Sequence, residues 1–179
     1  GQHQVNYLGG RTFDMAMTRN LHWKTLCYAN SQVLYGTYAD PAVSSQVLPG
    51  ATEAAPLSEE VWQSHQARYG MTSSVKYNIA HHTIQSGIWL ENNNQEMGQF
   101  FYNEPSLASG LAPLKTIGPY DVYGRAFMES YDFKWTTDTF QYFLSDTYRP
   151  IRNLDIHAGF KSLITTTSGG VQYNNEAYT

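Results

Sequence analysis

Apolar and polar residues alternate along much of the chain. The clearest case is 154–164, whose apolar residues share one face: Leu154, Ile156, Ala158, Phe160 and Ile164. Its polar residues Asp155, His157 and Lys161 fall on the other face. A period of two is typical of a half-buried strand, with Phe160 in the core. The same reasoning predicts further strands over 12–18, 21–29, 31–38, 75–80, 83–91, 122–135 and 139–144.

The segment 56–70 has a different pattern, which favours a short helix. Ser58 can cap it, and Glu59 and Glu60 would lie in the first turn, where the helix dipole favours carboxylates. Gly70 can close the end. The apolar stripe of this predicted helix consists of Val61, Trp62, His65 and Tyr69.

Two long stretches rich in Gly, Pro, Ala and Ser, 39–56 and 103–119, predict long loops on a strand scaffold. Many short strands, one inserted helix and long loops together predict an all-β fold. The expected architecture is an antiparallel two-sheet β-sandwich, with jelly roll as the leading topology and an open barrel as the alternative. We expect a single domain over 1–179, either a whole domain or the ordered core of a longer protein.

Composition narrows the classes of function. The 179 residues carry a net charge of -4, with 15% charged and 15% aromatic side chains. The acidic balance disfavours binding to a phosphate backbone, which requires clustered Lys and Arg. Cys27 is the only cysteine, which excludes an internal disulfide and a multi-cysteine metal site. No apolar run is as long as a membrane-spanning helix, so the sequence predicts no membrane insertion.

Candidate catalytic and metal-binding residues are few, and no hydrolase, phosphate-loop, zinc or dinucleotide motif is present. His81 and His82 resemble a pair of metal ligands. Neighbours on a strand point to opposite faces, however, so both are not expected to bind one metal. Asp155 and His157 share a face and are expected to form a structural pair. An acidic set could offer oxygen ligands to Ca²⁺ but lacks loop spacing, and a solvated rim is the simpler interpretation: Glu129, Asp132, Asp138 and Asp146.

Cys27 is expected to be a buried apolar residue. The four tryptophans, Trp23, Trp62, Trp89 and Trp135, could form a sugar-stacking platform, although a sandwich core is the favoured interpretation. The sequence therefore predicts a protein that is not an enzyme and has no catalytic, cofactor-binding or metal-binding residues.

The order of features resembles the capsid proteins of the parvovirus family, most nearly those of densoviruses. The resemblance lies in Leu57–Trp62 after a Pro/Leu segment, Ser74–Tyr77, Trp89–Asn93 and the late segment Arg149–Ile164. It covers about a third of the chain. It implies a jelly roll whose copies form an icosahedral shell around single-stranded DNA, and hence a location in the virion. The chain is shorter than such proteins and lacks their phospholipase region and basic arm.

The leading hypothesis is therefore a self-assembling viral coat protein with many copies of itself as partners. Viral single-stranded DNA would contact its inner face, and a host receptor or glycan would contact the loops 39–56 and 91–119. The alternative is a secreted β-sandwich carbohydrate-binding module. A third hypothesis is a jelly-roll enzyme that holds a metal with His81, His82 or His157.

Overall fold

The computed structural model describes residues 2–40, 57–104, 120–121, 124–126 and 128–174. Almost all of these residues lie in strands, and the described connections between the long strands are tight turns. The strands are β1 (Gln2–Ala16), β2 (Leu21–Asp40), β3 (Leu57–Ile79), β4 (His82–Glu104), β5 (Tyr120–Asp121), β6 (Gly124–Arg125), β7 (Met128–Ile151) and β8 (Leu154–Asn174).

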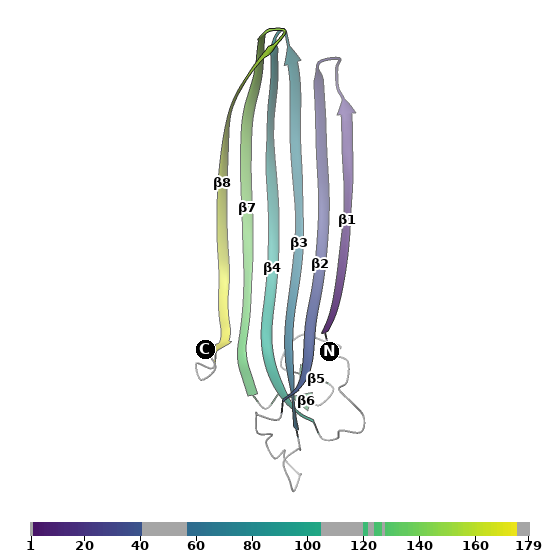
Figure 1. Cartoon of the computed structure of the whole chain (residues 1–179), viewed down its shortest axis with the longest axis vertical. Coiled ribbons are helices and arrows are strands. Elements are labelled where there is room, and N and C mark those ends of the chain that lie inside the picture. Colours follow the sequence, from purple (N-terminus) through teal and green to yellow (C-terminus); the bar gives the residue numbers. More distant parts are fainter. Residues whose placement is uncertain (1, 41–56, 105–119, 122–123, 127, 175–179) are drawn as a thin grey trace.

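Six of these strands form one antiparallel sheet in the order β1-β2-β3-β4-β7-β8, so that each long strand pairs with the next long strand in sequence (Figure 1). Tight connections lie at one end of the sheet, at 17–20, 80–81 and 152–153, and we call this the turn end. At the opposite end, the loop end, β2 and β4 finish and β3 and β7 begin; the long segments 41–56 and 105–127 separate these strands in the sequence. The two-residue strands β5 and β6 pair with each other there.

The predicted all-β, antiparallel class is confirmed, but the predicted helix over 56–70 is wrong. Residues 57–79 form the single strand β3, which pairs along its length with β2 and with β4. Two neighbours complete the backbone hydrogen bonds of β3, and this tertiary pairing outweighs a weak local helix propensity. Glu59 and Glu60 are therefore strand residues and not helix-start charges. The stretches predicted as separate strands over 21–29 and 31–38 are one strand, β2.

A fully buried apolar cluster lies near the loop end. Val61, Phe100 and Tyr102 have almost no exposed surface, and Ala126 packs with them. Elsewhere in the described part the sheet has large apolar side chains that are exposed, including Phe160, with 58% of its surface accessible. The expectation that Phe160 lies in a core is therefore wrong. Apart from the small β5–β6 pair, the described residues form one sheet, and most of that sheet has no second layer over it.

Within the described ranges, no helix is long and apolar enough to cross a membrane.

Candidate functional site: the two faces of the sheet

The strand register assigns each side chain to one of two faces. Paired residues of neighbouring antiparallel strands point to the same side, and successive residues of one strand point to opposite sides. In the regular part of the sheet, face A therefore carries the odd-numbered residues of β1, β2 and β3 and the even-numbered residues of β4, β7 and β8. The remaining residues form face B.

Face A is apolar in the half of the sheet near the turn end. Each strand contributes a run of large apolar side chains at alternate positions, and we call this set the apolar band. Its main exposed members are Phe13, Met15, Trp23, Tyr69, Val75, Tyr77, Ile79, Leu90, Phe140, Tyr142, Leu144, Tyr148, Ile156, Phe160 and Ile164. A contiguous exposed apolar surface of this size requires a partner, a ligand or a membrane to cover it.

Two ionisable sites interrupt the apolar band, and both are partnered. His82 Nδ1 and Asp146 Oδ2 share a hydrogen bond of 2.6 Å. The His82 ring also stacks on the Tyr148 ring, with the two ring centroids 4.6 Å apart. This pair lies beside the turn end, where β4 begins. Arg11 lies on the edge strand β1, with its guanidinium 5.3 Å from the centre of the Phe13 ring. A cation in this position is attracted by the face of the ring.

Face B is polar over the same half of the sheet. Near the turn end it has a cavity of about 280 Å³, lined by residues that include Asp14, His22, Lys24, Lys76 and Gln85. Apolar side chains are rare on this side compared with face A. Each strand in this half therefore presents an apolar row to one side and a polar row to the other, the alternation of a sheet between two different environments.

A hydrogen-bonded network rigidifies the centre of face B. Tyr28 donates to Glu91 over 2.5 Å and accepts from the indole of Trp89 over 2.8 Å. Arg68 donates to both carboxylate oxygens of Glu91, over 3.0 and 2.8 Å. Burial, and then the bond to Glu91, raises the pKa of the Tyr28 phenol, while the bond to Glu91 raises the pKa of Arg68. Tyr28 therefore remains a donor and Arg68 a cation at neutral pH.

Two glycines make room for aromatic rings on face B. A Cβ at Gly70 would lie 2.5 Å from the Tyr28 hydroxyl oxygen and 2.7 Å from the Leu90 carbonyl oxygen. A Cβ at Gly87 would lie 2.7 Å from the Phe143 ring. Rings that lie across strand glycines compensate for the packing that glycine lacks.

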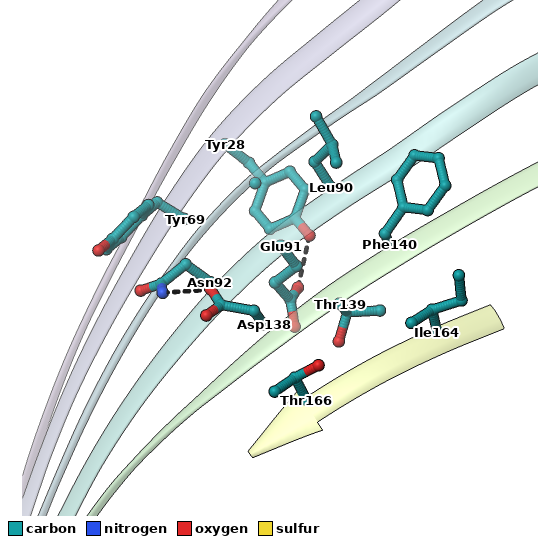
Figure 2. A pocket seen from close by; sticks show the side chains of 11 residues that line it. Tyr28, Tyr69, Leu90, Glu91, Asn92, Asp138, Thr139, Phe140, Ile164 and Thr166 are labelled. Carbon is teal, nitrogen blue, oxygen red and sulfur yellow. Dashed lines mark hydrogen bonds between the residues drawn. The ribbon is translucent and has the colours of Figure 1, made fainter. Parts of the chain in front are cut away.

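Where the apolar band ends, a row of polar side chains crosses face A. Asn92 donates to Asp138 over 2.6 Å, Asn94 donates to Asn92 over 2.8 Å, and Thr136 donates to Asn94 over 2.6 Å. A cavity of about 500 Å³ lies at this border, and Figure 2 shows its lining residues. The border lies midway along the strands. Beyond it face A carries polar residues such as Glu96 and Lys134, and nearer the loop end it carries the buried apolar cluster of Val61, Phe100 and Tyr102.

The structure separates the histidines and acids considered as ligands. His81 lies in the turn before β4, while His82 is held by Asp146. Of the acidic set, Asp138 pairs with Asn92 and Asp146 with His82. No group of three or more potential metal ligands occurs among the residues whose placement is described.

Asp155 and His157 each have a different partner. Arg149 donates two hydrogen bonds to the Asp155 carboxylate, over 2.5 and 2.6 Å, and this holds the pKa of Asp155 below its ordinary value. The His157 ring instead bonds with the Thr147 hydroxyl over 2.9 Å. The expected direct pairing of Asp155 with His157 is therefore replaced by one contact each across the β7–β8 hairpin.

The expected core positions differ from the observed ones. Cys27 is exposed on face A, not buried. Trp23 is exposed, and Trp62, Trp89 and Trp135 are only partly buried. The expectation of a sandwich core built on tryptophans assumed a second layer, and the described residues place none over these side chains. Of the loops expected to bind partners, 91–104 belongs to β4, while 41–56 and 105–119 lie outside the described residues.

Sequence reasoning missed the apolar band as a surface and the Tyr28–Glu91 network as a unit. The alternation was visible, but the faces of separate strands can be combined only once the register is known.

Comparison of the chain with protein families, with curated proteins and with solved structures gave no match.

Proposed function

We propose that this sheet is part of the wall of a transmembrane barrel of the outer-membrane type, with face A toward lipid and face B toward a polar interior. The observation that carries this proposal is the apolar band, which covers one face only and ends midway along continuous strands. In a protein-covered sandwich the inner face is apolar along the strands that it packs. Face A is apolar again near the loop end, but Val61, Phe100 and Tyr102 are already buried there. The exposed band therefore indicates a covering layer of limited thickness.

The height of the band fits a bilayer. On β3 it runs from Tyr69 to Ile79, and a membrane-crossing strand needs roughly 9–11 residues. Ten steps of about 3.3 Å, tilted by about 40°, cover roughly 25 Å, which is the height of the outward-facing apolar zone of such barrels. Tyr69 near one border and Tyr77 and Tyr148 near the other suit the interfacial zones, where aromatic residues concentrate.

The connections also support this proposal. The described connections at the turn end are tight turns, whereas at the loop end β2 and β3, and β4 and β7, are separated in the sequence by the long segments 41–56 and 105–127. Outer-membrane barrels have short turns on the periplasmic side and longer loops on the outer side. The proposal therefore places the turn end in the periplasm, and the half of the sheet near the loop end outside the bilayer.

The proposal requires closure of the sheet. In the described part, β1 and β8 each pair on one side only, and unpaired strand edges are not tolerated in lipid. Further strands must therefore pair with these edges, because the smallest barrels of this class have about eight strands. The interior that face B would line is polar and suited to water and polar solutes.

Fluorescence quenching by brominated lipid tests the assignment of the faces. Trp23 lies on face A within the band, whereas Trp62, Trp89 and Trp135 lie on face B. In vesicles of brominated phosphatidylcholine, we expect quenching of the folded protein's emission, and loss of most of that quenching in the Trp23→Phe variant. Trp89→Phe is the matched control and should leave the quenched component in place. Quenching that is absent, or that depends on Trp89 and not on Trp23, would refute the proposal.

A second candidate, favoured by the same exposed band, is the coat subunit expected from the sequence. There, a second sheet or a second copy would cover face A and complete a two-sheet jelly roll. Electron microscopy of the purified chain without lipid or detergent separates the candidates. Closed particles would support the coat subunit, and a protein that needs detergent to remain monodisperse would support the membrane wall. The carbohydrate-binding module has its best support in the polar row at the border of the band.

A further inference from the structure

The cavity at the border of the apolar band has two chemically different halves. Leu90, Phe140 and Ile164 line its side toward the turn end, and all three are exposed. Asn92, Asp138 and Thr166 line its side toward the loop end. The strand register places all six side chains on face A (Figure 2). A ligand that fills the cavity must therefore be apolar at one end and polar at the other.

The polar half offers both donors and acceptors. Asp138 Oδ1 accepts the bond from Asn92, which fixes the carboxylate, and Oδ2 has no hydrogen-bond partner among the described residues. The hydroxyl of Thr166 and that of Tyr69, which accepts from Asn94 over 3.4 Å, can each still donate a proton. Groups that both donate and accept, as alcohols do, complement this arrangement best.

The charges around the cavity further restrict the chemistry of the polar end of the ligand. No Lys, Arg or His is among the described residues that line the cavity, whereas Asp138 is an exposed carboxylate. Glu91 also lines the cavity, but its charge is already matched by Arg68. A phosphate would therefore be repelled by Asp138, and no lining residue is a cation that could offset the repulsion. An ammonium group would satisfy the carboxylate but could not accept from the Thr166 and Tyr69 hydroxyls.

We infer that this cavity binds a lipid with an uncharged, sugar-like headgroup. The hydroxyls of the headgroup contact Asp138, Thr166 and Tyr69, and the first part of the acyl chain lies on Leu90, Phe140 and Ile164. This inference rests on the proposed membrane position of the sheet, since the cavity then lies at the level of the outer headgroups. The cavity therefore recognises a sugar-like group as a carbohydrate-binding site would, but this group is attached to a lipid and is not a soluble sugar.

Native mass spectrometry of the full chain in nanodiscs tests the inference. The discs contain phosphatidylcholine with small, equal fractions of a diglucosyl diacylglycerol and of phosphatidylglycerol. We expect the glycolipid to remain bound about tenfold more often than phosphatidylglycerol. Asp138→Ala should reduce this preference about tenfold, because a hydrogen bond to a charged group is lost. Asn93→Ala, one position from Asn92 but on face B, is the matched control and should retain the preference.

A second variant tests whether the loss of glycolipid binding in Asp138→Ala comes from the cavity or from a general change in the protein. Thr166→Trp fills the cavity from the edge strand β8 without removing the Asn92–Asp138 bond, and it should also abolish glycolipid retention. Equal retention of both lipids, or preference for phosphatidylglycerol, overturns the inference. If Trp23 is still quenched by brominated lipid in that case, the membrane proposal survives and only the lipid site fails. If Trp23 is not quenched, the membrane proposal fails.

Discussion

The two halves of the sheet differ on face A although the same strands build both. Near the turn end, β4 and β7 present Leu90 and Phe140 to this face, whereas toward the loop end they present Asn94 and Thr136. Strand pairing is continuous through the change. Backbone geometry therefore does not distinguish the halves, and under the membrane proposal the difference reflects the medium that each half meets. Near the loop end, face B carries aromatic side chains, among them Trp62, Phe133 and Trp135, so polarity distinguishes the two faces clearly only in the half near the turn end.

The largest expected effect comes from a charge placed in the middle of the apolar band. Leu144 lies there, 52% exposed, between Ser86 on β4 and Phe160 on β8. Under the membrane proposal, Leu144→Arg should lower the free energy of unfolding from lipid vesicles by about 2–4 kcal/mol. Guanidinium titration of the vesicle-inserted protein, followed by tryptophan emission, measures the change.

The neighbouring residue provides the control for that substitution. Ser145→Arg adds the same side chain one position along β7 but on face B, where the interior is polar, and should change stability by less than about 1 kcal/mol. Equal losses for the two variants would mean that the two faces meet the same medium. That result would remove the contrast between the faces on which the membrane proposal depends.

A smaller effect is expected from Gly70, where the network of face B meets the backbone. In Gly70→Ala the new methyl group would displace the Tyr28 hydroxyl and press on the Leu90 carbonyl oxygen. We expect a loss of about 1–3 kcal/mol from this overpacking. Gly9→Ala is the control, since nothing lies within 4 Å of the added Cβ there, and it should be nearly neutral. Equal unfolding midpoints for the two variants would contradict the described packing around Tyr28.

Much of the sheet could be predicted from the alternation of residues, and the reasons for the failures are physical. The strand predicted over 154–164 is confirmed because its period-two pattern is broken only at Ser162 and Leu163. The face containing Phe160 was also identified, but it was assigned to a protein core, because alternation reports two different environments and does not identify either one. The helix predicted over 56–70 is wrong because capping residues and a short apolar stripe are weak local signals, and the pairing of this segment with strands on both sides outweighs them.

The Tyr28, Trp89, Glu91 and Arg68 network could not be predicted, because its members lie on β2, β3 and β4. Only the register of the sheet brings them together. The same applies to the cavity, whose apolar and polar halves come from alternate positions of three strands.

The last prediction compares two aspartates, one in each half, whose ionisation should affect stability in opposite directions. Near the turn end, the hydrogen bonds from Arg149 lower the pKa of Asp155 below its ordinary 3.8. Its contribution to stability is therefore present above that value and is lost as the pH falls through the lowered pKa. In the loop half, burial and then the charge of Glu96 raise the pKa of Asp132 above 3.8. The folded state then retains the proton longer, so this group favours folding at low pH and loses that contribution as the pH rises through the raised pKa.

Unfolding midpoints measured between about pH 2 and pH 7 for the wild type, Asp155→Asn and Asp132→Asn separate the two contributions. Relative to the wild type, Asp155→Asn should be less stable at neutral pH and converge with it in strong acid. Asp132→Asn should be at least as stable as the wild type at neutral pH and lose that advantage on acidification. Since Asp155 lies at the protein surface, its effect is expected to be the smallest considered and to weaken with added salt. Differences of the same sign for both variants would mean that the carboxylates meet similar surroundings in the two halves, contrary to the contrast between them.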